Sequence, residues 1–264
     1  MAALALRAFA CVLLIAAPLI ARADAPASVF LEDLTSPELA ARIRSGTTTV
    51  IIPVGGTEQN GAHMALGKHN VRVRVLSERI ARSLGNAVVA PVIAYVPEGS
   101  VNPPTGHMRY PGSITVPPDV YRGVVESAAR SFRLAGFRDI VLLGDSGDYQ
   151  KDNAMVAATL DKEWAASPVR VHAIGEYYRA ATVELFESLR KQGFSDAEIG
   201  PHAGLADTSL MMAVDPRLVR GDRLRTSEGV SGDPARASAE IGRGAAEVIV
   251  LQTVAAIRSA TQRK

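Results

Sequence analysis

The apolar run from residue 48 to residue 54 constrains the fold most, because a glycine-rich polar loop and a helix-like segment follow it directly. The run is rich in β-branched residues, which is typical of a buried strand. Residues 71–84 have the apolar spacing of a helix, with Asn70 as its expected cap and Gly85 at its end. Strand, loop and helix in this order predict one unit of an α/β fold.

The same alternation continues along the rest of the chain. Further strands are expected at residues 87–93, 139–143 and 169–174, and helices at 36–46, 117–136, 152–166, 176–192 and 233–259. Residues 201–212 are expected to begin with a His-Ala-Gly turn and to continue as a helix. This order favours an α/β fold with a mostly parallel sheet, helices on both faces and right-handed crossovers. The loops after residues 54 and 143 are then expected to leave the same edge of the sheet.

Residues 1–23 have the organisation of a secretory signal peptide. Arg7 gives a positive start, residues 9–20 form an apolar run, and residues 21–23 fit the small-residue cleavage rule. The run is too short for a membrane-spanning helix, so a retained anchor is the less favoured alternative. We expect a periplasmic or secreted protein without a stable membrane anchor, with one α/β domain over residues 24–264.

The composition limits the partners and the metal chemistry of the mature chain. Loss of Arg7 and Arg22 with the signal lowers the basic residues from 29 to 27, which equals the number of acidic residues. A near-neutral chain argues against a nucleic-acid partner bound through bulk charge. The single cysteine, Cys11, lies in the signal segment. A metal site would therefore use His, Asp and Glu, which suit zinc, manganese or iron.

The loop after the first expected strand is the first candidate site. Glu58, His63 and His69 lie between residues 55 and 70, at the edge where ligands collect in open α/β folds. Their spacing matches no local zinc motif. Polar residues that only cap and turn the loop are therefore the alternative.

The Gly144–Asp148 stretch is the second candidate site. Ser146 invites a serine-hydrolase interpretation, but a nucleophile elbow needs G-x-S-x-G, and Asp148 stands at the last position. A turn serine that caps the next helix is favoured instead. Asp145 and Asp148 are candidates for metal binding or for a helix cap, and without further context the cap is favoured.

Three histidines complete the candidates. His107 lies in a long Pro/Gly-rich loop over residues 95–116, a length that is often functional, and it is either a lid residue or a solvated one. His202 stands on a turn five residues before Asp207, and a buried, hydrogen-bonded histidine is the alternative there. His172 lies inside an apolar strand, and we interpret it as structural.

Five motifs in order make the chain resemble the creatininase family of metal-dependent amidohydrolases. They are Gly-Gly-Thr-Glu-Gln-Asn-Gly-Ala-His from residue 55, His-Met-Arg-Tyr-Pro-Gly-Ser from residue 107, the strand end at 144–148, His-Ala-Gly-Leu-Ala-Asp-Thr-Ser from residue 202 and Gly-Val-Ser-Gly-Asp-Pro from residue 229. The resemblance covers nearly the whole mature chain. It implies a three-layer αβα sandwich, often hexameric, with two divalent metals and a metal-activated water that opens cyclic or linear amides.

The resemblance also implies which positions bind metal. Glu58 is kept, Asn60 stands where a ligand histidine is expected, and His69 where a ligand aspartate is expected. Ser146 replaces a further ligand histidine, and Asp148 keeps a carboxylate with a shorter reach. Because two ligand histidines are lost, we expect at most one tightly bound ion, held by Glu58, His69 and Asp148. Zinc is favoured, with manganese or iron as alternatives.

The remaining site roles follow from the same resemblance. His202 is expected to be the proton shuttle, and Asp207 to be a catalytic carboxylate that is shorter than the glutamate of the family. His107, Asn60 and Ser146 are expected to bind substrate.

The sequence is compatible with two functions. The favoured one is an exported metal-dependent amidohydrolase, in which a metal-activated water attacks a small cyclic or linear amide. The alternative is a remodelled or inactive family member that binds a small ligand without turnover, which the changes at Asn60, His69 and Ser146 favour. The expected partner in both cases is a small molecule, and the resemblance implies a homo-oligomer.

Overall fold

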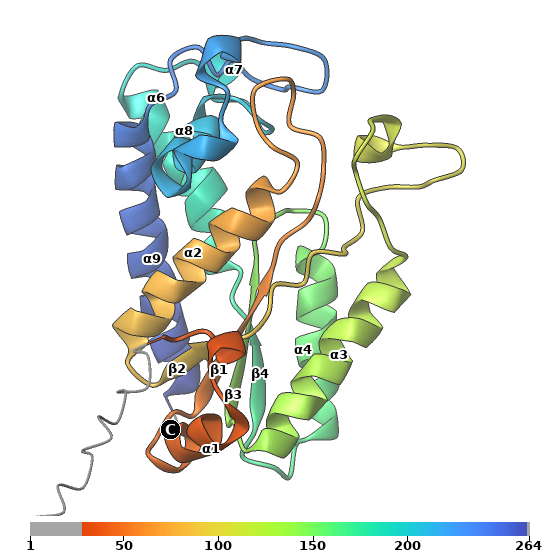
Figure 1. Cartoon of the computed structure of the whole chain (residues 1–264), viewed down its shortest axis with the longest axis vertical. Coiled ribbons are helices and arrows are strands. Elements are labelled where there is room, and N and C mark those ends of the chain that lie inside the picture. Colours follow the sequence, from red (N-terminus) through yellow and green to blue (C-terminus); the bar gives the residue numbers. More distant parts are fainter. Residues whose placement is uncertain (1–27, 263–264) are drawn as a thin grey trace, which may run out of the picture.

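A four-stranded parallel sheet forms the centre of the protein (Figure 1). The computed structural model describes residues 28–262. Its strands are β1 (Thr49–Val54), β2 (Ala87–Val89), β3 (Asp139–Gly144) and β4 (Arg170–Ala173), in the order β2-β1-β3-β4. All neighbouring strands are parallel. The central strands β1 and β3 are buried along their whole length, which explains why both are continuous apolar runs in the sequence.

Helices cover both faces of the sheet, each over its own hydrophobic cluster (Figure 1). One face carries α2 (Lys68–Leu84), α8 (Leu205–Val214), α9 (Ala239–Thr261) and a continuous helical stretch of α5 (Glu176–Arg179), the π-helical η3 (Ala180–Glu184) and α6 (Leu185–Lys191). The other face carries α1 (Ser36–Arg44), α3 (Pro118–Ala135) and α4 (Gln150–Glu163). The predicted three-layer αβα architecture is confirmed.

The short elements lie in the connections. They are η1 (Leu31–Asp33), η2 (Gly106–Arg109), α7 (Asp196–Ile199), η4 (Pro216–Leu218) and η5 (Gly221–Arg223). The long loop over residues 95–116 therefore contains one turn of 3-10 helix, η2. The strand expected at 87–93 ends at Val89, and the terminal helix expected from residue 233 begins at Ala239, so both begin or end inside the predicted bounds. The helix expected after the turn at residues 202–204 begins at Leu205.

The start of α2 differs from the prediction in a way that matters for the site. The helix begins at Lys68 and not after Asn70, so Lys68 and His69 belong to its first turn. Asn70 is not the cap, because its side chain binds the preceding loop instead. Its Oδ1 accepts a hydrogen bond from the N–H of Gly56 at 2.9 Å, and its Nδ2 donates to Thr57 Oγ1 at 3.1 Å.

The predicted signal segment, residues 1–23, lies outside the described residues. Export therefore stays a prediction, as does the domain boundary at residue 24. Within residues 28–262, no helix has both the length and the apolar character needed to cross a bilayer.

The buried hydroxyl of Tyr149 joins the loops that follow the two central strands. It accepts hydrogen bonds from the backbone N–H groups of Asp145 at 3.1 Å and Ser146 at 2.9 Å. It lies 2.5 Å from the backbone oxygen of Gly55, to which it donates. The loops after β1 and β3 are thereby held together, as expected for two loops at one edge of a parallel sheet.

We predict that Tyr149→Phe lowers the free energy of unfolding by about 1–3 kcal/mol, because it leaves buried backbone groups without partners. Urea unfolding followed by circular dichroism measures the change. Tyr95, which is 61% exposed, supplies the control; Tyr95→Phe is expected to change stability by less than about 0.5 kcal/mol. Equal midpoints for wild type and Tyr149→Phe would contradict the role of this hydroxyl.

Candidate active site

A small cavity lies at the carboxyl edge of the sheet, where the loops after β1 and β3 meet α2 and α8. Its volume is about 180 Å³, room for roughly six water molecules. The residues that line it are Glu58, Lys68, His69, Arg72, His107, Asp145, Ser146, Gly147, Asp148, Tyr178, Ala181, Thr182, Phe186, Gly200, Pro201, His202, Ala206 and Asp207. Segments that are far apart in the sequence thus contribute ionisable groups to one cavity.

His69 bridges two buried carboxylates. Its Nε2 lies 2.9 Å from Glu58 Oε1, and its Nδ1 lies 2.6 Å from Asp145 Oδ1. Burial and the charge of Lys68 oppose protonation of the ring, but the two carboxylates outweigh them and raise the pKa of His69. The imidazolium form is therefore favoured, and both of its N–H groups are donated to carboxylates.

Lys68 and Arg72 extend this contact into a closed charge network. Lys68 Nζ lies 2.8 Å from Asp207 Oδ2 and 3.3 Å from Glu58 Oε1. Arg72 donates from Nη1 to Asp207 Oδ1 at 2.8 Å, and from Nε to Asp145 Oδ1 at 2.8 Å. Three cations of α2 thus face three carboxylates. Such a balance is needed, because an unpaired charge in a buried position is very costly.

The cations keep the three carboxylates ionised. Burial by itself would raise the pKa of Glu58, but the charges of His69 and Lys68 lower it well below its usual range. Burial likewise opposes ionisation of Asp207, and Lys68 and Arg72 lower its pKa. The pKa of Asp145 is lowered against the effect of burial by Arg72 and His69.

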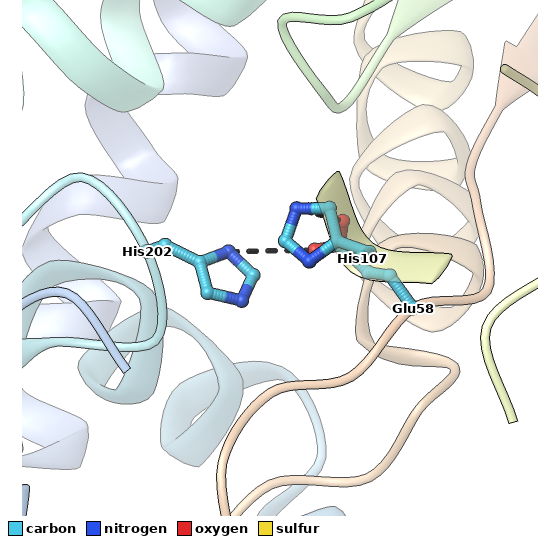
Figure 2. Close-up of side chains that lie close together, drawn as sticks. All are labelled: Glu58, His107 and His202. Carbon is cyan, nitrogen blue, oxygen red and sulfur yellow. Dashed lines mark ion pairs between the residues drawn. The ribbon is translucent and has the colours of Figure 1, made fainter. Parts of the chain in front are cut away.

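Glu58 also faces two imidazoles that lie outside this network. Figure 2 shows His107 and His202 directed toward its carboxylate from different segments. His107 Nε2 lies 3.1 Å from Glu58 Oε2, and His202 Nδ1 lies 3.6 Å from Glu58 Oε1. One ligand atom from each of the three residues lies within 4.8 Å of the other two. Ligand atoms around a tetrahedral zinc lie on the order of 3.3 Å apart, so the spacing suits a shared ion.

Hydrogen bonds to Gln59 orient both imidazoles. Its Oε1 accepts from the N–H of Gly61 at 3.0 Å, and its Nε2 donates to the Gly229 oxygen at 2.8 Å, which fixes the amide orientation. His202 Nε2 donates to the backbone oxygen of Gln59 at 2.9 Å, leaving Nδ1 to face Glu58 with a free lone pair. Gln59 Nε2 lies 3.3 Å from His107 Nδ1. Gly229 has φ +78°, and a Cβ there would come within 2.2 Å of Gln59, so only glycine fits.

A second group of possible metal ligands shares His107 with the group of Glu58, His107 and His202. Glu98, His107 and Asp148 each have one ligand atom within 4.8 Å of the others. Burial, with the charges of Glu58 and Asp148, raises the pKa of Glu98 to about 10. Burial and the charge of Glu58 also raise the pKa of Asp148.

The structure brings most of the predicted site residues together. The cavity is lined by Glu58, His69, His107, Ser146, Asp148, His202 and Asp207. Asn60 does not line it, because its Nδ2 donates to the backbone oxygens of Glu58 at 2.9 Å and Ala65 at 3.0 Å. Among the described residues, neither group of possible metal ligands contains His69, whose ring nitrogens both face carboxylates. The predicted ligand and substrate roles stay predictions.

Four residues around the cavity were missed from the sequence: Gln59, Lys68, Arg72 and Glu98. Lys68 and Arg72 lie in the first two turns of α2, where positive charge opposes the helix dipole. That conflict was the available signal, since cations in this place need nearby carboxylates. Gln59 and Glu98 gave no comparable signal, because a polar residue in a loop is ordinary.

Comparison with known proteins decides the family. The sequence profile of the creatininase family, described as creatinine amidohydrolase, matches residues 32–257. The chain belongs to the creatininase family. The creatinine amidohydrolase of Pseudomonas putida is 28% identical over 202 residues, which is 75% of this chain and 76% of that protein. A mycofactocin precursor peptide peptidase of Mycobacterium tuberculosis (strain CDC 1551 / Oshkosh) is 23% identical over 238 residues, covering 77% and 82%.

Solved creatininase structures share the fold and include a manganese form and a zinc form. A manganese creatininase has a TM-score of 0.72 at 25% identity, with 89% of this chain and 100% of that chain covered. A zinc form of a creatininase mutant, described as Zn-Zn type, has a TM-score of 0.70 at 26% identity, with 89% and 99% covered. The creatininase-family membership supports a hydrolase, and the Glu58 group is its possible metal site.

We predict that acid unfolds the protein through this charge network. The folded-state pKa of Asp145 lies below the unfolded value of about 3.9, so the stability it contributes is present above that pH and is lost as the pH falls through the folded pKa. Asp145→Asn, which leaves Arg72 and His69 without this partner, is expected to lower stability at pH 7 by about 3–5 kcal/mol. Its stability is also expected to depend less on pH below about 4.

Urea unfolding between pH 2 and pH 7 measures both effects. Asp222→Asn is the control, since Asp222 is exposed and its change is expected to stay within about 0.5 kcal/mol. Parallel pH profiles for the wild type and Asp145→Asn would contradict the prediction.

Proposed function

We propose that this creatininase-family protein is a metal-dependent hydrolase of a small amide, with its cation held by Glu58, His107 and His202. The observation that carries the proposal is the convergence of one ionised carboxylate and two imidazoles at the cavity. Two histidines and a glutamate are a known ligand set of catalytic zinc, which leaves a fourth position open. A bound divalent cation would polarise the amide carbonyl and lower the pKa of a water there.

His202 has the protonation state and the hydrogen bond that a metal ligand needs. Burial and the nearby charge of Lys68 lower the pKa of His202 to about 4, so the ring is neutral at neutral pH. Its Nε2–H is donated to the Gln59 oxygen, and metal-binding histidines usually donate their second N–H in this way. In this proposal His202 would hold the cation, in place of the proton-shuttle role expected from the sequence.

His107 needs a small rearrangement to bind a cation. Its Nδ1 accepts from the Gln59 amide at 3.3 Å, so Nε2 carries the proton that faces Glu58. A cation at Nε2 would require the ring proton to sit on Nδ1, which would break the contact with Gln59. This hydrogen bond is long, and Gln59 keeps its 2.8 Å bond to Gly229, so the loss is small.

The charge network holds the Glu58 carboxylate in place whether or not a cation is bound. His69 and Lys68 both contact its Oε1, at 2.9 Å and 3.3 Å, which fixes the carboxylate and keeps it ionised. Asp207 in turn holds Lys68. We therefore assign His69, Lys68 and Asp207 the task of holding Glu58 in place.

The cavity supports a small substrate. At about 180 Å³ it has room for a compact cyclic or linear amide and not for a folded polypeptide. Four carboxylates and three cationic side chains line it, an excess of one negative charge that favours a cation and a neutral or positively charged substrate. The signal-like residues 1–23 support a location outside the cytoplasm, and the family resemblance supports a homo-oligomer.

A second function is favoured by one specific observation. Lys68, His69 and Arg72 already neutralise Glu58, Asp145 and Asp207 without any metal. A protein with such internal counter-ions can bind a small amide through hydrogen bonds and not hydrolyse it.

We predict that the purified protein binds zinc and hydrolyses a small amide, and that Glu58→Gln loses both. Removal of the charged ligand is expected to lower zinc affinity and kcat/KM by roughly 100-fold or more. Elemental analysis, zinc titration and assays on creatinine and a panel of cyclic and linear amides measure the outcome. Chelation with dipicolinate should abolish activity, and added zinc should restore it.

Glu32→Gln is the control for loss of a negative charge, because Glu32 is exposed on η1 and is not one of the residues that line the cavity. It should leave zinc binding and hydrolysis unchanged. A metal-free protein that binds an amide without turnover would reject the hydrolase and favour the second function.

A further inference from the structure

Ala203, the residue after His202, has a backbone conformation that is unusual for a residue with a side chain. Its φ is +54°, in the left-handed region, and within residues 28–262 no other non-glycine residue has a positive φ. This conformation brings the Cβ close to the following carbonyl oxygen and costs free energy. Ala203 is fully buried, so contacts with its surroundings must hold it there. Strained residues of this kind gather at functional sites, where neighbouring contacts over-determine them.

Hydrogen bonds from α8 hold Ala203 on both sides of its α-carbon. The N–H of Ala203 donates to Asp207 Oδ2 at 2.9 Å, and its carbonyl oxygen accepts from Thr208 Oγ1 at 3.3 Å. Asp207 and Thr208 both lie in the first turn of α8. Because both peptide groups next to the α-carbon are bound, rotation about its φ and ψ is restricted. The first turn of α8 therefore stabilises the left-handed conformation.

The ring of His63 supports this contact from a different segment. Its Nε2 lies 3.0 Å from Thr208 Oγ1, and the ring has a further hydrogen bond with the backbone of Ala203. His63 is fully buried and does not line the cavity, so it does not touch a substrate there. It belongs to the loop after β1, as Glu58 does. The ring therefore joins the loop that carries Glu58 to the turn that carries His202.

The backbone of His202 is fixed on its other side by Ser231. The N–H of His202 donates to the Ser231 oxygen at 3.2 Å, and the His202 oxygen accepts from the Ser231 N–H at 2.9 Å. With this pairing and a fixed Ala203, the direction of the Cα–Cβ bond of His202 is set. Nδ1 of its ring then lies 3.6 Å from Glu58 Oε1 (Figure 2). A change of φ at Ala203 would turn the His202 peptide relative to α8 and move the ring away from Glu58.

We propose that His63 is a positioning residue for His202, which it keeps directed at Glu58 by holding Ala203 in the left-handed conformation. Without the His63 ring, Thr208 loses its partner and Ala203 moves toward a relaxed conformation. A cation at Glu58 and His202 is then expected to bind more weakly, because the groups that orient ligands strongly affect metal affinity. The inference rests on the proposed function in so far as His202 is a ligand of that cation.

Three variants test the proposal, with zinc affinity measured by competition with a chromophoric chelator. His63→Ala and Thr208→Val are each expected to weaken zinc binding by roughly tenfold. Thr208→Val keeps the shape of the side chain and so guards against a folding failure of His63→Ala. His63→Gln places an amide N–H near the position of Nε2, and it should keep zinc affinity within about threefold of the wild type.

The variant Ala203→Gly separates positioning from a general loss of structure. Glycine adopts a positive φ without strain, so in the Ala203→Gly background His63→Ala is expected to change zinc affinity by less than about threefold. The control is Ile257→Ala, because Ile257 is buried near the end of α9 and does not line the cavity. It should lower the Tm and leave zinc affinity unchanged.

The crystal structure of metal-free His63→Ala gives a readout that does not depend on zinc. The φ of Ala203 is expected to leave the left-handed region, and His202 Nδ1 to move out of reach of Glu58 Oε1. If both move but the wild type binds no zinc, the positioning role stands and the proposed metal site fails. If the wild type hydrolyses an amide with zinc, and His63→Ala matches it in zinc affinity and in structure, the proposed function stands and the positioning role is overturned.

Discussion

Pairing of three cations with three carboxylates at the start of α2 is the interaction on which the rest of the site depends. Lys68, His69 and Arg72 lie where the helix dipole disfavours positive charge. They are stable there because the loop after β1, the loop after β3 and α8 each bring one carboxylate to them. Each carboxylate is buried or nearly so, and each needs these cations in return. The network therefore ties four separate segments together at the carboxyl edge of the sheet.

Glu58 links this network to the chemistry of the cavity. Its Oε1 contacts His69 and Lys68, while its Oε2 faces His107. The carboxylate is thus oriented by the fold before any ligand arrives, which is the condition for a well-defined ligand set. A cation at Glu58 would share one carboxylate with the internal cations, so the strength of its binding depends on how firmly His69 and Lys68 hold that group.

The sequence predicted the parts of this site that depend on local order. Alternating strands and helices implied that the loops with Glu58 and Asp148 meet at one edge, and the parallel pairing of β1 with β3 confirms the geometry. The pairing of His69 with Asp145 was not predictable, because it depends on how α2 packs against a loop 76 residues away. The burial of Glu98 was likewise not predictable, since nothing in the local sequence distinguishes a buried loop glutamate from a solvated one.

The histidines that face Glu58 do not come from the positions where the family resemblance places ligand histidines. At residues 60 and 146, where the family resemblance places ligand histidines, this chain has Asn60 and Ser146. Asn60 instead binds backbone oxygens and stabilises its own turn. The imidazoles that face Glu58 come from His107 and His202, on loops that cover the sheet edge and are held through Gln59. Metal binding here would thus depend on two loop histidines, His107 and His202. It would therefore also depend on the hydrogen bonds of Gln59 that orient both rings.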